Sequence, residues 1–99
     1  MHRPLHYVTQ MVVVGPYCLR LTFEDGVVRE IDFFPILAGP MLSPLRDLEF
    51  FNRVRLDPEC RTIVWPNDAD FDPSELHDWP EVEADWIEAT NRWREAEGN

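Results

Sequence analysis

Residues 19–33 read LRLTFEDGVVREIDF, an alternation of apolar and polar side chains that a central Asp-Gly pair breaks once. This pattern predicts a β-hairpin. A three-residue loop ending on Gly26, in a left-handed conformation, would gather nearly all the apolar side chains on one face and place Arg20 opposite Glu30. A two-residue loop would instead put Leu21 opposite Glu30. We expect the three-residue loop, because opposite charges on facing strands stabilise a hairpin.

The length of 99 residues is enough for one domain with a single core, so we expect residues 1–99 to fold as one unit. The formal net charge is −10, and it is unevenly distributed. Residues 57–99 hold thirteen Asp and Glu against three Arg, whereas residues 1–56 are balanced. Such a surface repels phosphate and anionic lipid, so we expect neither direct nucleic-acid binding nor membrane binding.

The sequence contains no apolar run of the ~18 residues that a membrane span needs and begins with no apolar secretory segment. We therefore expect a cytoplasmic protein. Cys18 and Cys60 have no spacing typical of a disulfide framework or a zinc site, which indicates two free thiols.

The regions around the central hairpin predict further short elements. Residues 7–14 are rich in β-branched side chains and end at a Gly-Pro pair, which predicts a strand. Because its last four residues are all apolar, we expect a strand that is central in the sheet or buried on both faces. Three prolines follow, which predict one turn over residues 34–37 and a loop through residue 43.

Residues 47–54 predict a short helix that turns Leu48, Phe51 and Phe50 towards the sheet. A second hairpin is expected from residues 53–57 and 62–65. Asp72 then precedes Pro73 and Glu75 in the arrangement of a capping box.

Residues 80–97 predict one long helix that follows a cap at Asp78 or Trp79. Its apolar side chains recur at spacings of four and three and form one stripe, which consists of Val82, Trp86, Ala89, Trp93 and Ala96. We expect the stripe to pack on the protein's own sheet, and a surface for another chain is the alternative. The elements together predict an α+β fold with the order β3-α-β2-α and an acidic amphipathic C-terminal helix over residues 78–99.

Several short blocks together resemble a known family. They are LTFEDG (21–26), ID (31–32), LRD (45–47), FF (50–51), TIVWPN (62–67) and DFDPSEL (70–76). Over about residues 7–77 the chain resembles the bacterial domain of unknown function 2442, and the block from Trp65 to Leu76 is the most specific part. The resemblance implies a small α+β domain and no established biochemical role. The resemblance also implies that some relatives carry a helix-turn-helix after this domain and that others are encoded beside small toxin-like proteins. The acidic tail of this chain has no room for a helix-turn-helix.

Alternating carboxylates in the segment Asp68, Asp70 and Asp72 resemble the start of a calcium loop. The sixth position, which needs glycine, is Pro73, and the twelfth, which needs glutamate, is Trp79. The favoured interpretation is that Asp72 caps a helical turn, Asp70 accepts backbone N–H groups and Asp68 is solvated. A hard-cation site or an enzyme that uses this loop with His77 remains the alternative function.

Trp65, Asn67, Asp70 and Trp79 form the predicted partner-binding patch, because aromatic residues beside carboxylates can anchor an interface. The interpretation that we favour over a partner-binding patch is that both indoles close the end of the core.

The imidazoles of His2, His6 and His77 share no ligand spacing with a cysteine or carboxylate, so no metal site is expected. No nucleophile lies beside a plausible base, so we expect no catalytic residue and no cofactor. We expect a non-enzymatic protein-interaction module whose acidic half binds a basic partner, for which the resemblance implies a toxin-like neighbour. A homodimer stays open.

Overall fold

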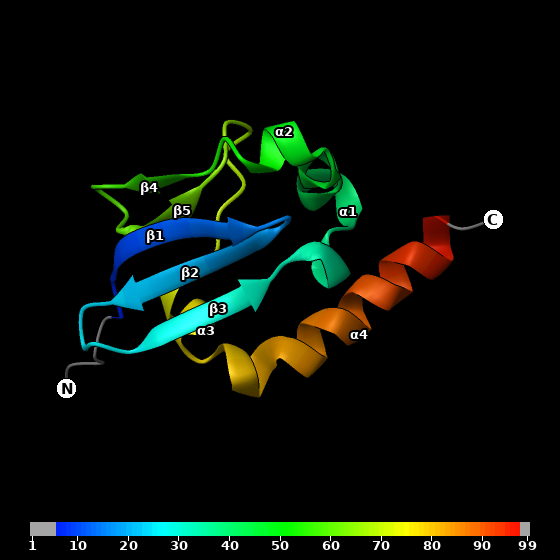
Figure 1. Cartoon of the computed structure of the whole chain (residues 1–99). Helices are drawn as coiled ribbons and strands as arrows, with labels where there is room; N and C mark the ends of the chain where they lie inside the picture. The colour runs from blue at the N-terminus through cyan, green and yellow to red at the C-terminus, as the bar shows by residue number, and fades with distance from the viewer. Residues whose placement is uncertain (1–5, 98–99) are drawn as a thin grey trace.

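A computed structural model describes residues 6–97 and combines strands with helices (Figure 1). The strands are β1 (Val8–Gly15), β2 (Cys18–Phe23), β3 (Val28–Asp32), β4 (Arg55–Asp57) and β5 (Thr62–Val64). The α-helices are α1 (Gly39–Leu42), α2 (Leu48–Phe51), α3 (Pro73–His77) and α4 (Trp79–Glu97), and the 3-10 turns are η1 (Phe34–Ile36) and η2 (Ser43–Arg46). The α+β class predicted from the sequence is confirmed.

The hairpin of β2 and β3 has the predicted register. Leu19 faces Ile31, and Arg20 faces Glu30, with 2.8 Å between Arg20 Nε and Glu30 Oε2. Gly26 has a φ of +89°, so the three-residue loop is confirmed together with its left-handed glycine. The apolar residues that face each other across β2 and β3 in this register form one side of the core.

Strand β1 is not central, and this prediction was wrong. The sheet order is β1-β2-β3, which leaves β1 at an edge, and Val12, Val13 and Val14 are 48%, 43% and 39% exposed. The start of the strand is covered, since Val8 is buried and its N–H donates to Arg61 O at 3.0 Å, and further along only Met11 packs partly against the core. A β-branched run therefore reports strand propensity here and not burial.

The segment between the two sheets forms short helical turns. The predicted loop through residue 43 was wrong, because α1 and η2 each have proline in their first turn, where a missing N–H costs nothing. Helix α2 is shorter than the predicted range 47–54, and Asp47 is its cap, with Oδ1 accepting from Glu49 N at 3.0 Å. Phe51 is buried as predicted, but Leu48, predicted to face the sheet, is 38% exposed in this one-turn helix.

Aromatic side chains fill the core. The ring of Phe33 is fully buried and lies 5.3–6.1 Å, between centroids, from the rings of Phe51, Trp65, Phe71 and Trp79. Trp65 Nε1 donates to Phe51 O at 2.8 Å, whereas within residues 6–97 the buried Nε1 of Trp79 has no hydrogen-bond partner. These rings join the sheet to the helices.

Helix α3 begins with half of the predicted capping box. Asp72 Oδ1 accepts from Ser74 N at 2.8 Å, but Glu75 Oε1 accepts from Trp86 Nε1 on α4, at 3.1 Å.

Helix α4 runs past β3 and α1 in Figure 1, and its C-terminal end lies well away from the sheet. None of the helices in the described residues is both long enough and apolar enough to cross a membrane.

The buried face of α4 differs from the predicted stripe. Thr90 is 4% exposed and its hydroxyl donates to Trp86 O at 2.8 Å, while Trp93 is 49% exposed. The helix packs chiefly on η1, α1 and α3. Val82 and Trp86 of the predicted stripe are partly buried against the core, whereas Trp93 is half exposed. The expected packing therefore holds for the first half of the stripe and was wrong for Trp93.

Candidate functional site

Two of the four residues predicted to bind a partner lie in the core. Trp65 is 1% exposed and Trp79 is 4% exposed, so their indoles close the core, as the favoured interpretation held. Asn67 is half-buried, donates from Nδ2 to Met41 O at 3.0 Å and accepts from Ala69 N at 3.2 Å. Asp70 alone of the four is fully at the surface.

The three carboxylates of the predicted cation loop have separate roles. Asp72 caps α3, Asp68 is exposed with a φ of +67°, and the backbone of Asp70 forms a β-bridge with Val64. Asp70 was predicted to accept backbone N–H groups in this loop, but the residue that accepts the Ala69 N–H is Asn67. Among residues 6–97, these three aspartates form no group close enough to share one metal ion.

The predicted stripe of α4 forms an apolar band at the surface, which we call the α4 band (Val82, Trp86, Ala89, Trp93 and Ala96). It lines two shallow hollows of about 320 and 290 Å³, and Asp85, Glu75 and Arg92 lie at their rims. The ring of Trp93 lies against Gly39, where an added Cβ would be 3.4 Å from Trp93 Cε2. The band thus continues onto α1, where Met41 is 48% exposed.

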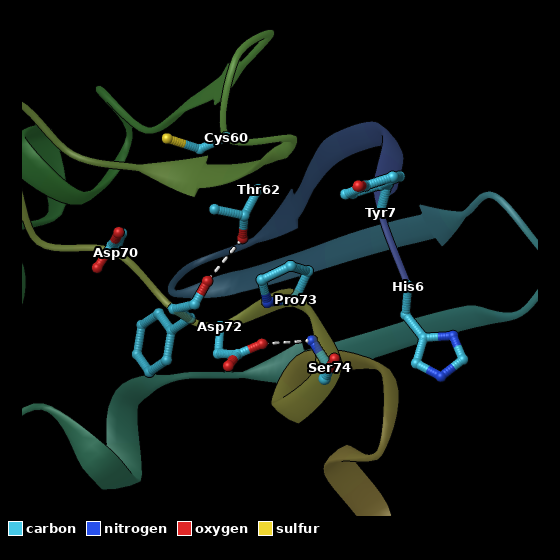
Figure 2. A pocket seen from close by; sticks show the side chains of 9 residues that line it. His6, Tyr7, Cys60, Thr62, Asp70, Asp72, Pro73 and Ser74 are labelled. Carbon is cyan, nitrogen blue, oxygen red and sulfur yellow. Dashed lines mark hydrogen bonds between the residues drawn. The ribbon is translucent and has the colours of Figure 1, made fainter. Parts of the chain in front are cut away.

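A larger hollow of about 460 Å³ lies between the start of β1, the second hairpin and α3 (Figure 2). Its lining includes His6, Tyr7, Cys60 and Asp70. The figure shows His6 and Cys60 at opposite ends of the hollow, so the thiol and the imidazole do not meet there. The pair therefore has no arrangement for thiol activation.

Beside this hollow, the structure brings together His6, Asp25 and His77. The imidazole rings of His6 and His77 stack with 3.7 Å between centroids and 12° between planes. Asp25 Oδ2 lies 2.7 Å from His77 Nε2 and 3.8 Å from His6 Nδ1. One ligand atom from each residue lies within 4.8 Å of the others, which makes this the group in the described chain that can share a metal ion.

Hydrogen bonds hold two members of this group from behind. Asp25 Oδ1 accepts from Val27 N at 3.1 Å, so Oδ2 faces the imidazoles. Asp78 Oδ1 lies 2.9 Å from His77 Nδ1, and Arg29 Nε donates to His77 O at 2.8 Å. The side chain of His77 is only 13% exposed, so this geometry is partly shielded from water.

The surroundings of His77 and Asp25 favour the charged form of both side chains. Burial lowers the pKa of His77, but hydrogen bonds to Asp78 and Asp25 outweigh this effect and the pKa is raised overall. The pKa of Asp25 is lowered, first by the hydrogen bond from Val27 N–H and further by His77. Without a metal ion, an ion pair joins the hairpin loop to the end of α3.

No pattern in the sequence predicts this cluster. His77 and Asp25 are 52 positions apart, and His6 lies at the start of the described chain. No ligand spacing joins them, so motif reasoning had no means of bringing these residues together. His2 lies outside the described residues.

Comparison with known proteins places the chain in a family. A family model described as protein of unknown function (DUF2442) matches residues 8–86. No curated protein and no solved structure matches the chain. The matched range extends beyond the predicted limit at residue 77 into the first half of α4, where Trp79 and Trp86 pack against the aromatic core. Because the match covers most of the sequence, this protein belongs to the DUF2442 family.

Proposed function

We propose that this chain is a non-enzymatic protein-interaction module that binds a basic, amphipathic segment of a partner protein along the α4 band. The observation that carries the proposal is the exposure of Trp93, which is 49% accessible. Large aromatic side chains anchor many protein interfaces, and a half-exposed indole on a helix surface is costly to leave in water.

The surroundings of Trp93 support one continuous surface. Met41, 48% exposed, lies with it around a hollow of about 300 Å³, and Ala89 and Ala96 extend the surface along α4. Small residues beside a large anchor leave room for the side chains of a docked helix. The surface can therefore accept an apolar helix face.

The charge around the band supports a basic partner over a second copy of this chain. Glu81, Asp85 and Glu88 are exposed on α4 beside the band, and the nearby cation Arg92 is paired with Glu88 at 2.7 Å. A second copy would bring the same carboxylates face to face, whereas Lys and Arg of a partner would complement them. The product of a neighbouring gene, such as a toxin-like protein, is the partner class that we propose.

The state of the thiols supports a non-enzymatic role in the cytoplasm. Both cysteines are free. Burial, and then the carboxylates of Asp32 and Glu30, raise the pKa of the Cys18 thiol, which is the opposite of what a nucleophile needs. Free thiols are also typical of a reducing compartment.

Co-expression with the products of the flanking genes tests the proposal. We expect a basic product to co-purify with this chain, and Trp93→Ala or Met41→Ala to weaken the complex by about 10-fold or more. Binding should also weaken as the salt concentration rises, because the proposed attraction is electrostatic at its rim. Isothermal titration at two ionic strengths measures both effects.

Val12→Ala is the matched control, since Val12 and Met41 are each 48% exposed but lie on different elements, β1 and α1. This variant should bind like the wild type. Loss of binding in Val12→Ala but not in Trp93→Ala would assign the interface to β1 and contradict the proposal. A homodimer that Trp93→Ala converts to monomer in sedimentation would replace the basic partner by a second copy, and no complex with any basic neighbour would also overturn the proposal.

A further inference from the structure

We infer that His6, Asp25 and His77 form a binding site for a divalent transition-metal ion of the zinc type. The three residues come from the start of the described chain, the β2–β3 loop and the end of α3, so they meet only in the folded protein. Two imidazoles and one carboxylate are a donor set that zinc accepts, with a further position left for water.

The distances lie close to those that an ion requires. A tetrahedral ion with bonds of about 2.0–2.2 Å holds its ligand atoms about 3.3–3.6 Å apart. The contact between His77 Nε2 and Asp25 Oδ2 is 2.7 Å, and that between His6 Nδ1 and Asp25 Oδ2 is 3.8 Å. An ion must therefore widen the first contact and shorten the second, by less than 1 Å in each case. The His6 ring, which is stacked on the His77 ring, has to tilt so that its Nδ1 points at an ion between the two side chains.

Two of the three donor atoms, His77 Nε2 and Asp25 Oδ2, are already oriented towards each other. Asp78 at 2.9 Å holds Nδ1 of His77, so Nε2, which is bonded to Asp25 Oδ2, is the nitrogen that would meet a metal, as in the usual carboxylate–histidine–metal arrangement. Val27 N–H holds Asp25 Oδ1, so Oδ2 faces His77 Nε2, and an ion would replace the hydrogen bond between these two atoms. Ligands that are oriented in advance lose less conformational entropy when the ion binds.

The donor atoms and charges select the class of metal. Imidazole nitrogen favours zinc, nickel, cobalt and copper over magnesium and calcium, which prefer oxygen alone. Asp25 and Asp78 supply two negative charges, and Arg29, which donates to the His77 carbonyl, supplies one positive charge. A divalent cation is therefore compatible with the local charge when both histidines are neutral.

Isothermal titration of tag-free protein with zinc chloride tests the site. We expect one ion per chain and no binding of magnesium. Asp25→Asn and His77→Gln should each weaken zinc binding by about 10-fold or more. With cobalt, ligation should give visible d–d absorption, and NMR should show the imidazole signals of His6 and His77 moving together.

Asp70→Asn is the matched control, because Asp70 is an exposed carboxylate outside the cluster, and Cys60→Ser excludes binding through the exposed thiol. Both variants should bind zinc like the wild type. Circular dichroism of Asp25→Asn and His77→Gln confirms that they are folded. No zinc binding by the wild type, unchanged binding in both cluster variants, or loss of binding in Cys60→Ser would overturn the inference.

Discussion

The substitutions Trp65→Phe and Trp79→Phe should have different costs although they remove the same atoms from the same core. Both indoles are nearly fully buried, so the loss of ring volume is similar and largely cancels in the comparison. Trp65→Phe breaks the 2.8 Å bond to Phe51 O, which keeps a second partner in Val54 N–H at 3.1 Å, so we expect an extra cost of about 1 kcal/mol. Trp79→Phe removes an N–H that is buried without a partner, which relieves about 1–3 kcal/mol.

The two variants should therefore differ by about 2–4 kcal/mol in the free energy of unfolding, with Trp79→Phe the more stable. Urea denaturation followed by far-UV circular dichroism measures the difference without relying on tryptophan fluorescence. For a domain of this size, a difference of 2 kcal/mol corresponds to a Tm separation of about 8–16 °C. Equal stability of the two variants, or a less stable Trp79→Phe, would refute the assignment of hydrogen-bonded and unpartnered indoles.

Three further predictions concern α4, the hairpin and the histidine pair. Trp86→Ala should cost about 3 kcal/mol and Trp93→Ala about half as much, because Trp86 packs on the aromatic core while Trp93 is half exposed; urea titrations with equal losses would contradict this. Gly26→Ala should cost about 1–2 kcal/mol, because its φ of +89° strains any L side chain, and an unchanged melting temperature would argue against the turn. With a chelator present, the pair of His77 and Asp25 should stabilise the fold most between pH 3.8 and 6.5. The raised pKa of His77 contributes stability that is lost as the pH rises through its folded value, and the lowered pKa of Asp25 contributes stability that is lost as the pH falls through its own. His77→Gln should flatten this profile in thermal melts, and an unaltered profile would show that other groups produce it.

The parts of the fold that could be predicted depend on local patterns. The register of β2 and β3 followed from side-chain alternation and one cross-strand charge pair, both of which lie within fifteen residues. The burial of β1 could not be predicted in this way, because the hairpin that covers only its first residues lies about fifty residues later. Periodicity likewise shows which residues of α4 share a face, but the position of η1 and α1 decides that Thr90 is buried and Trp93 is not.

The histidine cluster shows the same limit at the site. Side-chain alternation correctly predicted the hairpin loop that holds Asp25, and the capping residue Asp72 predicted the start of the short helix that ends at His77. That these two ends meet depends on tertiary contacts such as the one from Arg29 to the His77 carbonyl, which no spacing rule contains. A motif search detects ligands that one segment supplies, and here each ligand comes from a different segment.

The open edge of β1 has a consequence for handling the protein at high concentration. In residues 6–97, β1 has β2 as its one partner in the sheet, although Val8 N–H also donates to Arg61 O, and its exposed Val12–Val14 run carries no charge. An uncharged, β-branched edge is a template for intermolecular strand pairing and aggregation, and the sequence has no lysine that could guard it. The net charge of −10 keeps copies apart at neutral pH. Acidification that protonates the carboxylates removes this colloidal protection, so solubility should fall first where the charge is neutralised.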